Sequence, residues 1–65
     1  MFKNFYMLSI DGKVKAIVIV DHRDDAAFLR SDPPEGDIKF CSMPLENWYT
    51  FKLTVEAEGT QIVGD

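Results

Sequence analysis

The chain has 65 residues, of which 46% are hydrophobic and 28% are charged. This length allows one domain with a thin core, so we expect residues 1–65 to fold as a single compact α+β unit. The composition is that of a globular domain and excludes a disordered tail, a collagen-like repeat and a disulfide-rich scaffold. The longest apolar run, Ala16 to Val20, is far shorter than the roughly 20 residues that a membrane helix needs.

Two segments near the N-terminus predict a β-hairpin. Phe5 to Ile10 is rich in aromatic and apolar residues, Asp11-Gly12 follows, and Lys13 to Val20 is again β-prone. Asp-Gly between two such segments is a strong hairpin signal, because glycine tolerates the positive φ of a type I′ turn. From Ala16 onward the second strand is apolar at every position, so we expect it to be buried on both faces.

The following segment has the features of a short helix. Asp21 is suited to be its N-cap, and Asp24 and Asp25 lie where the positive end of the helix dipole favours acids. Ala26 to Leu29 supply helix propensity and an apolar stripe. The Pro33-Pro34 pair cannot continue a helix, so we expect this one to end after two or three turns.

The second half of the chain predicts three strands. Ile38 to Ser42 reads as a short strand that Pro44 ends, and Thr60 to Val63 reads as a short last strand. Trp48 to Ala57 alternates strictly between apolar and polar residues, which is typical of a half-buried antiparallel strand. The predicted order is β-β-α-β-β-β, an α+β fold with one short helix packed on one face of a small, mostly antiparallel sheet.

The alternation from Trp48 to Ala57 also predicts which side chains form the core. Phe51 and Leu53 fall on its apolar face, where we expect them to pack against Val18 and the predicted helix. Trp48, Thr50 and Lys52 fall on its polar face. An exposed tryptophan suggests a binding hot spot, although Trp48 can also fold over the end of the sheet.

The charge of the chain is negative and concentrated in one segment. The net charge is −4, and six of the eleven acidic residues lie between Asp21 and Asp37. Nucleic-acid backbones are bound by Lys and Arg, so an acidic chain is better suited to a basic surface on another protein. Mild negative charge also serves solubility alone, so this segment is either an interface or only a solvated helix and loop.

The sequence offers little that points to catalysis or to a metal. Asp21, His22, Asp24 and Asp25 contain metal-binding side chains but lack the Cys or additional His residues of a zinc site. Cys41 pairs in principle with His22 as nucleophile and base, but a single cysteine more often serves as a small buried hydrophobe. The glycine-rich nucleotide motifs and the serine-hydrolase motif are absent, so we expect no enzyme, cofactor or metal.

These observations favour a non-enzymatic protein-binding module that docks on a larger protein or complex with a basic surface. The size, charge and lack of motifs suggest a small inhibitor or regulator of the phage or mobile-element type. The expected contact residues are Asp21, Asp24, Asp25, Trp48, Thr50 and Lys52. A homodimer would enlarge the thin core. The single cysteine fits a cytoplasmic protein, and we expect no membrane partner.

A second hypothesis is a small nucleic-acid-binding protein. The first hairpin carries Lys13 and Lys15, and aromatic side chains on a small sheet bind single strands by stacking. The residues available for stacking are Phe2, Phe5, Tyr6, Trp48 and Tyr49.

Overall fold

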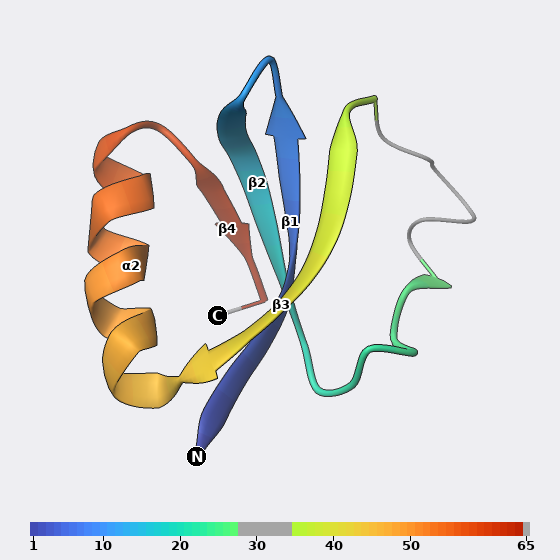
Figure 1. The fold of residues 1–65 in the computed structure, drawn as a ribbon, viewed down its shortest axis with the longest axis vertical. Helices are drawn as coiled ribbons and strands as arrows, with labels where there is room; N and C mark the ends of the chain where they lie inside the picture. Colours follow the sequence, from blue (N-terminus) through green and yellow to red (C-terminus); the bar gives the residue numbers. More distant parts are fainter. Residues whose placement is uncertain (28–34, 65) are drawn as a thin grey trace.

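The computed structural model describes residues 1–27 and 35–64 and shows an α+β fold (Figure 1). A four-stranded, mixed and mostly antiparallel sheet has one helix, α2, packed against it. The elements are β1 (Phe2–Ile10), β2 (Lys13–Val20), β3 (Asp37–Pro44), α2 (Leu45–Ala57) and β4 (Gln61–Val63). The fold class is therefore the one predicted, but the helix packed against the sheet is a segment that the sequence predicted to be a strand.

The first hairpin confirms the sequence prediction. Asp11 and Gly12 have φ values of 53° and 77°, so both occupy the left-handed region that a type I′ turn requires. β1 and β2 pair antiparallel from Asn4 opposite Val20 to Ile10 opposite Lys13, with a bulge where the register shifts between Leu8 and Ser9. β1 begins at Phe2, three residues before the expected start, because its first residues pair with β3.

The order of strands in the sheet is β3-β1-β2-β4. β1 pairs antiparallel with both β2 and β3, and β4 pairs parallel with β2. The strands β2, β3 and β4 therefore run in one direction, and the two connections between them are crossovers. The β3–α2–β4 crossover passes over one face of the sheet and carries the helix.

The described ends of the β2–β3 connection lie against the opposite face (Figure 1). The Tyr6 hydroxyl donates a hydrogen bond to the carbonyl of Arg23, and the Arg23 guanidinium lies 5.5 Å from the centre of the Phe40 ring. At the other end, Gly36 lies against Leu8 and the backbone of Ser9.

The segment from Trp48 to Ala57 is helical, and our prediction of a strand there is wrong. Apolar residues recur at two periods in this segment, and Trp48, Phe51 and Val55 also fit the i, i+3, i+7 spacing of a helix. The helix spacing prevails because one side of α2 then covers the apolar face of the sheet with Trp48 and Val55.

Both ends of α2 have backbone hydrogen bonds that the alternation pattern did not suggest. The first N–H, that of Leu45, donates to the carbonyl of Met1 on the neighbouring strand at 3.0 Å. At the C-terminus, Thr60 donates to Val55 and Gly59 donates to Glu56, which is the bonding of a Schellman motif. Gly59 has a φ of 92°, which a glycine adopts without strain. The Thr60 hydroxyl then donates to the carbonyl of Val14 at 2.8 Å and attaches this turn to β2.

The predicted Asp21 cap is not formed, although Ala27, within the predicted helical segment Ala26 to Leu29, is helical. From Asp21 to Ala26 the backbone makes a turn, in which the N–H of Asp25 donates to the carbonyl of His22. The Asp25 carboxylate accepts a hydrogen bond from the N–H of His22, so it closes this turn instead of capping a helix. The remaining part of the predicted helix and the Pro33-Pro34 stop fall in residues 28–34, outside the described residues.

The core forms between α2 and the inner face of the sheet. Phe5, Ile17 and Trp48 are fully buried, and the Phe5 and Trp48 ring centres lie 5.1 Å apart. Phe51 stacks on Phe5 and is half-buried, whereas Leu53 points away from the sheet and is 71% exposed. The predicted burial of Leu53 against Val18 is therefore wrong. Val18 pairs with Tyr6 and lies on the face opposite α2.

Candidate interaction surface

Trp48 is part of the core and is not a contact residue for a partner. Its side chain has no exposed surface, and it packs against Phe5 and Phe51. The Lys3 ammonium lies 5.8 Å from the centre of its ring, in a cation–π contact. The sequence placed Trp48 on a polar strand face, but helical geometry turns it towards the sheet.

The other two predicted residues of this segment lie on α2 with different exposure. Thr50 is exposed on the outer side of the helix, and its backbone carbonyl accepts a hydrogen bond from the Thr54 hydroxyl. Lys52 is half-buried at the border of the packed side and has an interaction partner. Thr50 is therefore available for a contact, whereas Lys52 is partly engaged within the chain.

The predicted acidic residues Asp21, Asp24 and Asp25 are exposed in the turn after β2. This turn contacts the face of the sheet opposite α2, through Tyr6 and Arg23. The structure therefore does not bring the acidic residues and α2 into one continuous surface, and Figure 1 shows the two on opposite sides of the sheet.

The outer side of α2 carries an apolar ridge that is half-buried at Leu45 and exposed from Tyr49 onward. Leu45, Tyr49, Leu53 and Ala57 are spaced four residues apart and therefore lie one above another along one row of the helix surface. We call these four residues the α2 ridge. Tyr49 is 59% exposed and Leu53 is 71% exposed, so the side chains in the middle of the α2 ridge face solvent.

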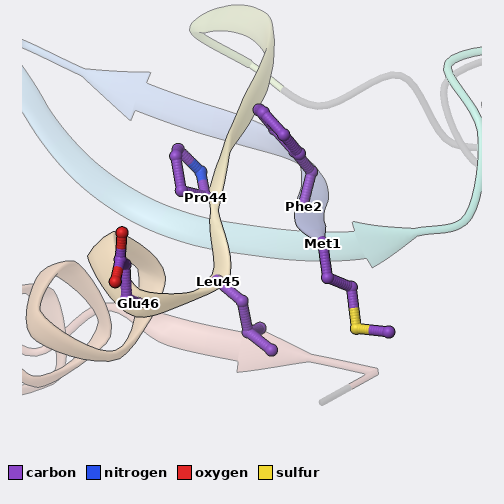
Figure 2. A pocket seen from close by; sticks show the side chains of 5 residues that line it. All are labelled: Met1, Phe2, Pro44, Leu45 and Glu46. Carbon is purple, nitrogen blue, oxygen red and sulfur yellow. The ribbon is translucent and has the colours of Figure 1, made fainter.

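The N-terminus extends this ridge at the start of the helix. Met1 is 97% exposed, and its backbone is bonded to that of Leu45. Figure 2 shows the side chains of Met1 and Leu45 pointing to the same side, while Phe2 and Pro44 point away from them. These residues and Glu46 line a shallow hollow next to the first turn of α2.

The border of the α2 ridge is acidic. Glu46, Glu56 and Glu58 lie on or directly after α2, and Lys52 is the one basic residue of the segment 45–58, which gives a net charge of −2. Glu46 lies in the first turn, where the positive end of the helix dipole stabilises its carboxylate. The C-terminal turn carries no basic residue that would offset Glu56.

The lysines of the first hairpin lie beside an acidic side chain. Lys13 and Lys15 line a hollow whose other wall is Glu58 and Gly59. A phosphate at this point would meet the carboxylate as well as the two ammonium groups. Three of the five aromatic residues available for stacking, Phe5, Tyr6 and Trp48, are buried, which leaves Phe2 and Tyr49 exposed.

The side chains considered for metal binding and for nucleophilic catalysis are not brought together among the described residues. They contain no group of three or more His, Cys, Asp or Glu side chains that could hold a metal ion. Cys41 lies half-buried on the helix-facing side of β3, whereas His22 lies in the exposed turn on the opposite side of the sheet, so the two are not paired. Within the described part of the chain, no helix is long and apolar enough to cross a membrane.

Comparisons of the chain with protein-family models, with curated proteins and with solved structures found no match.

The alternation pattern did not indicate Leu53 as a surface residue, because it placed Leu53 on the apolar face of a strand, and it offered Tyr49 only as an aromatic residue for nucleic-acid stacking. The four-residue spacing from Leu45 to Ala57 was the signal that could have identified them. A helix of this length needs only one apolar side for packing, and Trp48, Phe51 and Val55 already supply it. In the second apolar row Leu45 still packs against this core, whereas Tyr49 and Leu53 are exposed.

Proposed function

We propose that this protein is a non-enzymatic binding module that docks on a larger protein through the α2 ridge. The observation that supports this proposal is the exposure of Tyr49 and Leu53 on the helix that also supplies the core residues Trp48 and Val55. Because the inner side of α2 is held against the sheet, the ridge is presented on a fixed support, and docking requires little ordering of the backbone.

The residue types of the ridge suit a protein contact. Tyrosine combines a large apolar ring with a hydroxyl group and is enriched among residues that dominate binding energy. Leu53 adds an apolar side chain one turn away, and Met1 extends the surface with a flexible thioether. The glutamates at the border would attract a basic partner and raise its association rate.

Site-specific photocrosslinking in the source cells tests this proposal. A photoreactive phenylalanine analogue at Leu53 should crosslink to one discrete protein, because this position lies in the middle of the ridge. The analogue at Val63, which is 45% exposed on β4, is the matched control and should give no such product. The Tyr49→Gln substitution should remove the product formed from position 53.

Two results would contradict the proposal. A product that forms equally well from positions 53 and 63, or that survives the Tyr49→Gln substitution, would show that the ridge is not the contact surface. A nuclease-sensitive product would instead favour the nucleic-acid hypothesis, which a salt titration with single-stranded oligonucleotides tests separately. Steep loss of oligonucleotide binding with rising salt would support that alternative.

A further inference from the structure

We infer that the α2 ridge recognises an amphipathic helix of another protein whose apolar stripe is bordered by lysine or arginine, and that it does not pair with a second copy of this chain. This inference rests on the proposed function and specifies the partner of the same surface. It follows from the shape of the ridge, from the charge of its border and from the register that a self-pair would have.

The shape of the ridge matches the side of another helix. From Leu45 to Ala57 the row extends over three turns, which corresponds to about 18 Å along the helix axis. Rows of this spacing pack into the grooves between equivalent rows of a second helix. Tyr49 and Leu53 stand at the centre of the row, where the contact excludes most water and contributes most to affinity.

The charge of the border selects the partner. Glu46 and Glu58 border the apolar row on one side, which carries no basic residue, whereas Glu56 borders the other side one turn from Lys52. A helix with basic side chains beside its apolar stripe would neutralise these carboxylates. A helix with acidic borders would meet them with like charge, so the same apolar contact would be weakened.

A second copy of this chain would place its own acidic border against the acidic border of the first. One flank of the α2 ridge is the row Glu46, Thr50, Thr54 and Glu58. If two copies pair antiparallel through their ridges, this row lies beside the same row of the second copy, which runs in the opposite direction. Glu46 of each copy then meets Glu58 of the other, and both segments carry a net charge of −2. Like charges placed opposite each other at a helix contact disfavour association, so self-pairing through this ridge is opposed.

Two synthetic helical peptides test the inference directly. Both carry leucine at the positions of one apolar stripe, and their border positions are all lysine in one peptide and all glutamate in the other. In calorimetric titrations of the full chain, we expect the lysine peptide to bind and the glutamate peptide to bind at least about tenfold more weakly. The double variant Glu46→Gln/Glu56→Gln should reduce this difference.

Variants of the chain locate the contact. Leu53→Gln should weaken binding of the lysine peptide by about tenfold or more, as for a central contact residue. Val63→Gln removes an exposed apolar side chain from β4 and should leave the affinity within about twofold. Sedimentation equilibrium should give the same average mass for the unmodified chain and for Leu53→Gln, because the ridge does not mediate self-association.

Three outcomes would overturn the inference. These are equal binding of the two peptides, binding that Leu53→Gln leaves unchanged, and a dimer that Leu53→Gln dissociates. Failure of both peptides to bind would also overturn the inferred partner, a helix with basic borders. In that case a Leu53 crosslink to a discrete protein in cells would still support the proposed function, so the two failures are distinguishable.

Discussion

We expect Trp48→Ala to lower the stability strongly and Leu53→Ala to lower it little, which is the reverse of what the sequence alone suggests. If Trp48 to Ala57 were a strand, Leu53→Ala would remove a core side chain and Trp48→Ala a surface one. In the helical structure Trp48 is fully buried and Leu53 is 71% exposed. The two alanine substitutions therefore test directly whether α2 is a helix packed in this orientation.

The expected magnitudes differ severalfold. Trp48→Ala removes a ring that contacts Phe5 and Phe51 and leaves a cavity, which costs about 3–5 kcal/mol. A chain of 65 residues has a total stability of roughly 3–10 kcal/mol, so this variant should be largely or fully unfolded. Leu53 buries about a third of its surface at most, so Leu53→Ala should cost less than about 1 kcal/mol. The greater helix propensity of alanine offsets part of this loss.

Urea denaturation followed by far-ultraviolet circular dichroism measures both effects. Trp48→Phe retains an aromatic ring at the site and should remain folded with an intermediate loss, so it gives a value even if Trp48→Ala does not fold. If Leu53→Ala proves as destabilising as a core truncation while Trp48→Ala unfolds like the parent, α2 is not packed as described. The ridge would then be part of the core, and the proposed docking surface would be wrong.

Three further predictions concern the turns, the acidic segment and metals. Gly59→Ala should reduce stability by about 1–2 kcal/mol in urea denaturation, because its φ is 92° but no atom lies within 4 Å of an added Cβ. Gly36→Ala should cost more, since its Cβ would lie 2.5 Å from the carbonyl oxygen of Ser9, and equal losses would contradict this geometry. The double variant Asp24→Asn/Asp25→Asn should leave affinity for the lysine-bordered peptide within about twofold at 0.15 M salt, where screening acts over about 8 Å. A larger effect in the same calorimetric titration would place the acidic turn in the contact. Addition of EDTA or Zn²⁺ should change the melting temperature by less than about 1 °C in a thermal scan, and a rise of several degrees would reveal a metal site.

Local chemistry determined the elements that the sequence predicted correctly. The Asp11-Gly12 turn requires two residues that tolerate positive φ, and few other dipeptides satisfy it. The uninterrupted apolar stretch at the end of β2 predicts cover on both faces; in the structure Ile17 and Ile19 pack on the side of α2, whereas Ala16, Val18 and Val20 on the other face are half-buried. The α+β class follows from these features because a small sheet with an apolar inner face needs a helix against it.

Tertiary packing, and not local sequence, determines which segment forms that helix. The residues from Tyr49 to Ala57 follow a period of two, whereas only Trp48, Phe51 and Val55 mark a helical period, and the aromatic and β-branched residues favour a strand. The sequence alone therefore could not determine whether Trp48 or Leu53 faces the core. The sheet decides it, since the cavity above Phe5 and Ile17 is filled by the larger tryptophan ring when the segment is helical. The same packing leaves Tyr49 and Leu53 on the outside, so the candidate docking surface follows from tertiary structure and not from the local pattern.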